Sequence, residues 1–178
     1  MARLYTLTHP AVAGVDGVMC ERQAVRGVVL DGEYILLLYT RRYDDYSFPG
    51  GGLDAGETAE QGLVREMQEE TGATGVRIGR YLGYGDEYRP PHKPGYDALF
   101  MRSHFYLCQA DRVLGYATPD SYEVTNGMVP KWLNIHDAIR HNASVLAGKP
   151  ANMGLSIGRE TLMLKYVVEC VLRCAGKQ

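Results

Sequence analysis

The chain has 178 residues, of which 46% are hydrophobic, and its formal net charge is −2. This length and apolar content suit one domain, residues 1–178, with a sizeable core. A nearly neutral chain without a Lys/Arg-rich run lacks the electrostatic signature of nucleic-acid binding, so we expect no nucleic-acid partner. No apolar run approaches a membrane span of about 20 residues, and residues 1–14 do not resemble a signal peptide. We therefore expect a cytoplasmic protein with no membrane partner.

The first part of the chain predicts strands joined by turns. Residues 1–21 indicate an N-terminal strand or hairpin, and residues 24–30 a strand. Residues 33–40 are its apolar partner, joined to it by a tight turn at Asp31-Gly32.

Residues 48–73 concentrate glycine and carboxylate, and they divide into a loop and a helix. Thr58 and Gln61 have the spacing of a capping box, and Gly72 follows the last turn as a helix-ending residue. Leu63, Val64 and Met67 form an apolar stripe that can pack on a sheet. Four glycines in the loop favour a sharply bent backbone that approaches a ligand closely: Gly50, Gly51, Gly52 and Gly56.

Three carboxylates on this helix lie within about a third of its circumference, namely Glu66, Glu69 and Glu70. Their mutual repulsion suggests that a cation binds among them, and hard oxygen ligands suit Mg²⁺ or Mn²⁺. Arg65 lies four residues before Glu69 and can pair with it. The alternative is a solvated acidic helix face, but the coincidence of loop, cap and Arg-Glu pair favours the metal site.

The second half of the chain predicts further strands and helices around two polar loops. We predict strands at 76–84, 98–108 and 129–135, helices at 136–146 and 159–174, and loops at 85–97 and 111–127. Strands on both sides of the acidic helix, with helices left to cover both sheet faces, predict a three-layer α/β/α sandwich with a mixed sheet.

Four cysteines are scattered without the spacing of zinc ligands. We interpret Cys20, Cys108, Cys170 and Cys174 as reduced core residues.

The stretch from Gly51 to Ala73 resembles the signature box of the Nudix hydrolases, G-x5-E-x7-R-E-U-x-E-E-x-G-U, where U is a bulky aliphatic residue. Ala73 is small where a larger residue is usual. The resemblance implies a Nudix-type α/β/α fold and Mg²⁺-dependent hydrolysis of a nucleoside diphosphate linked to another moiety. The fixed positions of the box are Gly51, Glu57, Arg65, Glu66, Met67, Glu69, Glu70 and Gly72.

The same resemblance implies a division of roles at the site. Glu66, Glu69 and Glu70 would bind the metal together with the backbone carbonyl of Gly50, and Glu57 would complete the site through water or Arg65. The family places its general base outside the box in several members. Our candidate base is Glu123, with Glu87 and Asp120 as alternatives; the other interpretation of Glu123 is a solvated loop charge.

Substrate contacts are predicted on both sides of the box. Arg41 and Arg42 end a strand just before the box loop, where a cation could meet a phosphate, and two exposed arginines are the alternative. Gly51 and the segment Tyr88-Arg89-Pro90 are the other candidates. These three residues lie 15 to 17 positions past the box, where in the family one residue sometimes tracks the substrate class: proline points to ADP-ribose and tyrosine to dinucleoside polyphosphates. Both are present, so this feature does not decide the substrate.

Two rival functions share the fold. A nucleotide-binding regulator would usually lose box carboxylates, and none is lost here. An isopentenyl-diphosphate isomerase would carry a Cys-Gly-His-Pro segment, which this sequence lacks. The substrate stays open among nucleoside triphosphates, ADP-ribose, dinucleoside polyphosphates and sugar nucleotides, and a homodimer is an open expectation.

Overall fold

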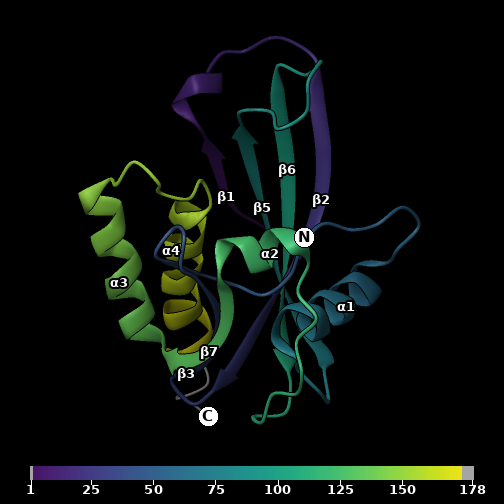
Figure 1. The fold of residues 1–178 in the computed structure, drawn as a ribbon, viewed down its shortest axis with the longest axis vertical. Helices are drawn as coiled ribbons and strands as arrows, with labels where there is room; N and C mark the ends of the chain where they lie inside the picture. The colour runs from purple at the N-terminus through teal and green to yellow at the C-terminus, as the bar shows by residue number, and fades with distance from the viewer. Residues whose placement is uncertain (1, 174–178) are drawn as a thin grey trace.

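The computed structural model describes residues 2–173, which form a mixed sheet between two helical layers (Figure 1). The sheet has seven strands in the order β1-β5-β6-β2-β3-β4, with β7 beside β3. The strands are β1 (Arg3–Thr8), β2 (Met19–Asp31), β3 (Tyr34–Thr40), β4 (Asp45–Ser47), β5 (Arg77–Arg89), β6 (Ala98–Gln109) and β7 (Met128–Asn134). The helices are α1 (Ala59–Thr71), α2 (Ser121–Asn126), α3 (Ile135–Gly148) and α4 (Ile157–Tyr166).

Two apolar cores, one on each face of the sheet, explain the three layers. On one face Leu63 and Met67 of α1 pack on Val25 and Val29 of β2. On the other, the core brings α3 and α4 against β2, β3 and β6. The predicted α/β/α sandwich with a mixed sheet is confirmed. Val64 is half-buried at the outer surface of α1, so its predicted place in the packing stripe was wrong.

The sheet opens between β2 and β3, and this opening positions the site. β2 pairs with β6 along most of its length but with β3 only at Leu30↔Ile35 and Asp31↔Tyr34. Beyond that point the box loop takes the place of β3 beside β2. The amide of Val25 donates to the Gly51 carbonyl at 2.9 Å, and that of Gly27 donates to the Pro49 carbonyl at 2.9 Å. These bonds hold the loop backbone at a fixed place in the sheet.

Several predicted boundaries differ from the structure; β2, for example, begins at Met19, before the predicted strand 24–30. β5 continues to Arg89, because its second half pairs with both β1 and β6, so backbone polar groups that a loop would leave to water are satisfied. The predicted loop 111–127 contains the short helix α2, which Asp120 caps. The first hairpin turns one residue later than predicted, at Gly32-Glu33, where Gly32 has φ +60°.

The cysteines are less uniformly buried than predicted. Cys108 is a buried free thiol, Cys20 is partly exposed and Cys170 is exposed, so the core interpretation was wrong for Cys170. Cys170 lies in a π-helical turn, Val167–Leu172, that continues α4. Cys174 lies outside the described residues.

Within residues 2–173, none of the helices combines the length and the apolar content needed to cross a bilayer.

Candidate active site

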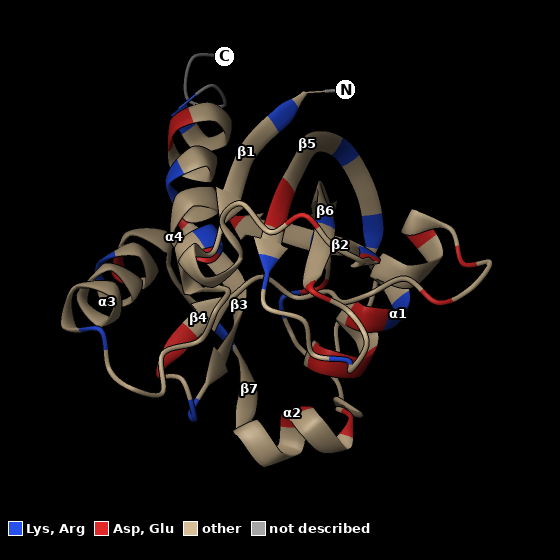
Figure 2. Cartoon of the chain, turned by 90° about the horizontal axis from the view of Figure 1, so that it is seen from above, with Lys and Arg blue, Asp and Glu red and all other residues tan. Residues whose placement is uncertain are grey.

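A cavity of about 560 Å³ lies where β2 and β3 separate, and charged side chains of both signs line it. Figure 2 shows acidic segments on α1 and α2 and a basic segment on α4. The acidic residues that line it are Asp45, Glu66, Glu70, Asp120, Glu123 and Glu160, and the basic ones are Arg22, Arg26, Arg89 and Arg159. Charges of both signs suit a ligand that brings both a cation and an anion into the cavity.

The acidic residues include a cluster of three carboxylates from two helices. One carboxylate oxygen from each of Glu66, Glu70 and Glu123 lies within 4.8 Å of the others. Glu123 reaches the box residues because Asp120 caps α2 and orients its first turn: the amide of Glu123 donates to Asp120 Oδ1 at 2.8 Å. The structure thus brings together two predicted metal ligands and the predicted base.

Glu70 is the most deeply buried member of the cluster, with 8% of its surface exposed. Its Oε2 accepts a hydrogen bond from the Gly50 amide at 2.6 Å. Burial nevertheless raises the pKa of Glu70 well above its usual range, and burial also raises the pKa of Glu66. A divalent cation would favour the ionised forms, and three carboxylates are the hard oxygen donors that Mg²⁺ and Mn²⁺ prefer. The donor set therefore fits such an ion.

Two glycines of the loop are required by close contacts at this cluster. Gly50 has φ +126°, and a Cβ there would lie 2.2 Å from the Val25 carbonyl oxygen. A Cβ on Gly51 would lie 2.4 to 2.6 Å from the carboxylate atoms of Glu66. Only glycine lets the loop backbone approach both β2 and α1 so closely.

The guanidinium of Arg65 joins the box carboxylates. Its Nε and one terminal nitrogen donate to the two oxygens of Glu57, both at 2.9 Å. The other terminal nitrogen donates to Glu66 at 2.9 Å and to Glu69 at 3.1 Å. The carbonyl of Gly52 accepts a further bond at 3.3 Å. The predicted pairing of Arg65 with Glu69 is confirmed, and the hydrogen bonds from Arg65 lower the pKa of Glu57 to about 2.

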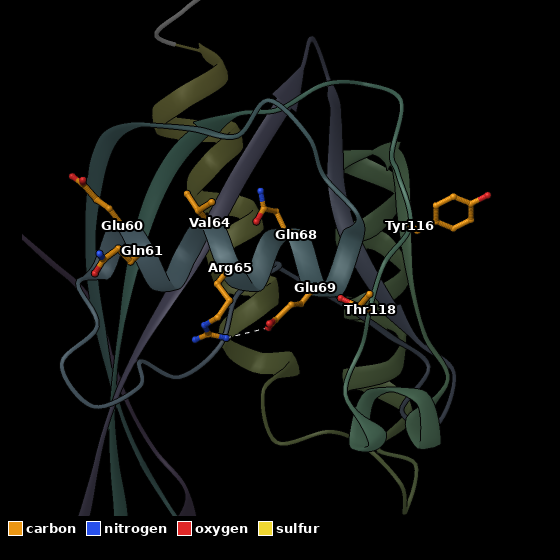
Figure 3. A pocket seen from close by; sticks show the side chains of 8 residues that line it. All are labelled: Glu60, Gln61, Val64, Arg65, Gln68, Glu69, Tyr116 and Thr118. Atoms are coloured by element: carbon orange, nitrogen blue, oxygen red, sulfur yellow. Dashed lines mark hydrogen bonds and ion pairs between the residues drawn. The ribbon is translucent and has the colours of Figure 1, made fainter.

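Glu69 lies apart from the cluster, on the outer side of α1 (Figure 3). There its carboxylate points to Arg65 and is 45% exposed, beside a shallow hollow that Tyr116 and Thr118 also line. Its backbone carbonyl accepts from the Thr118 amide at 2.8 Å. The metal-ligand role of Glu69 stays a prediction.

Two of the predicted substrate contacts, Gly51 and Arg89, line the cavity. The charge of Arg89 is already engaged, because its Nε and a terminal nitrogen donate to Glu87 at 3.1 and 2.5 Å. Tyr88 packs instead against Phe100, with ring centroids 5.3 Å apart.

Arg41 and Arg42 hold the end of β3 to the end of α2. The Arg41 amide donates to the Gly127 carbonyl at 3.2 Å, and the Arg42 guanidinium donates to Asn126 Oδ1 at 3.1 Å. Neither arginine is among the described residues that line the cavity. Their predicted contact with substrate stays a prediction.

The two alternative bases are engaged elsewhere. Glu87 is buried, and although burial by itself would raise its pKa, Arg159 and Arg89 lower it overall. Arg159 donates to Glu87 at 2.7 Å. Asp120 accepts the α2 capping bond. Of the three candidates, Glu123 is the one whose carboxylate lies with Glu66 and Glu70.

Sequence reasoning missed the charged floor of this cavity. Asp45, Arg159 and Glu160 are each 2% exposed or less, and the three line the cavity together with Arg26. Glu160 accepts hydrogen bonds from Arg159 and from the Phe48 amide, the latter at 3.2 Å. Only Arg26 carried a signal, as a charged residue within the apolar run of β2.

A family model described as the NUDIX domain matches residues 21–151, and the chain belongs to this family. A solved structure, the NUDIX hydrolase from Nitrosomonas europaea, has the same fold: the TM-score is 0.56 at 16% identity, over 84% of this chain and 91% of that one.

Two curated relatives share shorter segments with this chain. An 8-oxo-(d)GTP phosphatase of Mycolicibacterium smegmatis is 49% identical over 49 residues, which are 28% of this chain and 15% of the relative. An RNA pyrophosphohydrolase of Baumannia cicadellinicola is 39% identical over 71 residues, 38% of this chain and 45% of the relative. The matches thus span less than half of each relative.

Proposed function

We propose that this protein is a Mg²⁺-dependent hydrolase that cleaves the pyrophosphate bond of a nucleoside diphosphate linked to another moiety. The observation that carries the proposal is the convergence of Glu66, Glu70 and Glu123 within 4.8 Å at a cavity that also presents arginines. A structural or purely regulatory domain has no need to keep three repelling carboxylates together.

Glu66, Glu70 and Glu123 would hold the cation, with the Gly50 carbonyl as a further oxygen donor. Arg65 has a positioning role, because it fixes Glu57, Glu66 and Glu69 in one hydrogen-bonded group. When bound, the cation would neutralise charge on the phosphoryl oxygens and lower the pKa of water.

Hydrolysis also needs a group that takes a proton from the attacking water. Glu123 is our candidate for that group in addition to its proposed place at the cation. One of its oxygens accepts a hydrogen bond from the Asp120 amide at 2.8 Å, and its carboxylate faces the cluster where the water would be held. No nucleophilic side chain is required, so we expect label from H₂¹⁸O to appear in a phosphate product. Label in a sugar or alcohol product would mean cleavage of a C–O bond instead.

The experiment that tests the function is a substrate panel with Mg²⁺ or Mn²⁺, scored for released phosphate, pyrophosphate or nucleoside monophosphate. The panel contains nucleoside triphosphates, ADP-ribose, dinucleoside polyphosphates and sugar nucleotides. It also contains 8-oxo-dGTP and RNA with a 5′-triphosphate, since curated relatives carry names that refer to these chemistries. We expect turnover of a small nucleotide that excess EDTA abolishes and Mg²⁺ restores. Turnover in EDTA would contradict the proposal, and turnover of RNA alone would contradict the expected absence of a nucleic-acid partner.

A further inference from the structure

We propose that Arg26 is a substrate-binding residue that holds a phosphoryl group of the ligand in the cavity, from the strand beside the box loop. This inference rests on the proposed function for the identity of its ligand, an anionic phosphate, but its geometry stands independently. Neither the box nor the spacing around it points to this residue.

The alternation of β2 places the Arg26 side chain in the cavity. Its neighbour Gly27 faces α1, where a Cβ would lie 2.8 Å from Met67 Sδ. Arg26 therefore points to the other face of the sheet and lines the cavity. Its Cα lies next to Gly50, since a Cβ on Gly50 would be 3.0 Å from it. The arginine thus stands beside the loop that binds Glu70.

The other two arginines at the floor of the cavity are already paired. Arg159 donates to Glu87 at 2.7 Å and to Glu160, and Arg89 donates to Glu87. The remaining carboxyl at this end, Asp45, takes part in none of the ion pairs within 4.0 Å in the described part of the chain.

Arg26 differs from both of these arginines. Its Nε is buried and has no hydrogen-bond partner. Across residues 2–173, none of the ion pairs within 4.0 Å includes its guanidinium. Glu87 and Glu160 are thus paired with Arg159 and Arg89, and Arg26 has no carboxylate partner among them.

The buried Nε of Arg26, without a hydrogen-bond partner, is unfavourable unless a ligand uses it. The planar fork of arginine donates two parallel hydrogen bonds to phosphate oxygens, which a lysine ammonium cannot do. A phosphoryl group bound near both the carboxylate cluster and Arg26 would meet the cation and the fork. That arrangement gives Arg26 the partner that the chain itself does not supply.

The test compares Arg26→Met and Arg26→Lys with Arg80→Met, which removes an exposed β5 charge outside the cavity. Binding of inorganic pyrophosphate in Mg²⁺ is measured by calorimetry, and thermal melts are recorded in EDTA without any anion. We expect Arg26→Met to lower the affinity for pyrophosphate about 10- to 100-fold, as for the loss of a charge-assisted hydrogen-bonded pair. Arg26→Lys should lose less, and Arg80→Met should bind as wild type. In the anion-free melt, Arg26→Met should be at least as stable as wild type, because it removes an Nε that is buried without a hydrogen-bond partner.

Equal pyrophosphate affinity in wild type and Arg26→Met would overturn the inference, as would absence of measurable binding to the wild type. A lower melting temperature of Arg26→Met with unchanged affinity would assign it a structural role instead. If Arg26→Met did not fold, Arg26→Lys would decide: wild-type affinity in that variant would contradict a forked phosphate contact. Wild-type turnover of the substrate panel is scored separately. A pyrophosphate site that depends on Arg26 without turnover would defeat the proposed function and leave this inference standing.

Discussion

Glu70 links the loop to the helix, because one oxygen accepts the Gly50 amide while the carboxylate lies beside Glu66 and Glu123. Its buried position works against ionisation, since the charged form loses water without gaining an ion pair. The ionised side chain thus lowers the stability of the metal-free protein, and we expect a bound cation to offset this cost.

We predict that Glu70→Gln lowers kcat at least about 100-fold without destabilising the metal-free fold. Glutamine can still accept the Gly50 amide, and it removes a carboxyl whose pKa is raised on folding. A raised pKa gives stability that is complete below about pH 4.5 and is lost as pH rises through the folded pKa. The stability of the variant relative to wild type in EDTA should therefore increase with pH. A variant that melts several degrees lower yet keeps its turnover would show that Glu70 is structural.

Arg65→Lys keeps the positive charge but cannot hold Glu57 with two parallel hydrogen bonds. We expect this variant to lose activity and some stability together. The pKa of Glu57, about 2, lies below its ordinary value, so its stabilising effect is present above about pH 4.5 and is lost as pH falls toward 2. In thermal melts between pH 2 and 5, the melting temperature of the variant should fall less steeply with decreasing pH than that of wild type. An equally steep fall in both proteins would contradict the stabilising pair between Arg65 and Glu57.

At the scale of elements, the site depends on how closely the box loop approaches its neighbours. Gly50→Ala and Gly51→Ala form a matched pair. The methyl group added at Gly50 would clash with the backbone of Val25, whereas the one added at Gly51 would meet only the movable carboxylate end of Glu66. Gly50→Ala should destabilise the protein by about 1–3 kcal/mol, owing to φ +126° and the clash with Val25. Gly51→Ala should keep most of the stability but displace Glu66 and weaken Mn²⁺ binding at least about 10-fold. Equal metal affinity in Gly51→Ala and wild type would show that Glu66 is not a ligand.

The capping box of α1 offers the complementary case, a change that affects the element but not the chemistry. The Thr58 side chain accepts from the Gln61 amide at 3.2 Å, and the Gln61 side chain accepts from the Thr58 amide at 3.0 Å. We predict that Thr58→Ala lowers the free energy of unfolding by about 1 kcal/mol. Denaturant melts measure that change, and kcat at 25 °C should stay near wild type. A large loss of kcat would mean that the cap positions the ligands directly.

At the scale of the whole molecule, buried charged side chains from β4, β5 and α4 lie close enough to affect one another's ionisation. Burial and the nearby Glu160 raise the pKa of Asp45 to about 6. Its contribution to stability is complete below about pH 3.8 and is lost as pH rises through 6. We predict that Asp45→Asn is more stable than wild type at pH 8, by an amount on the order of 2 kcal/mol, and that the difference disappears near pH 4. A pH-independent difference in denaturant melts would contradict this.

The sequence contained enough information for the parts that local chemistry determines. The capped acidic helix, its αL end at Gly72 and the Arg65–Glu69 pair follow from spacing alone, and the structure confirms them. The extension of β5 to Arg89 could not be foreseen, because it depends on pairing with β1, far away in the sequence. The same holds for the charge pairs of Arg159, whose partner Glu87 lies on another element. Glu123 was a candidate base only because it lies on a loop after the box in the sequence. Its approach to Glu70 depends on the tertiary fold, which the sequence pattern did not reveal.

The central claim is that Glu66, Glu70 and Glu123 form one divalent-cation site, and Mn²⁺ titration followed by electron paramagnetic resonance tests it most directly. Wild type is compared with Glu123→Gln and with Glu60→Gln, which removes an exposed α1 carboxylate outside the cluster. We predict at least about a 10-fold loss of Mn²⁺ affinity in Glu123→Gln and none in Glu60→Gln, because only the first removes an oxygen ligand. Wild-type affinity in Glu123→Gln, or an equal loss in both variants, would contradict the claim.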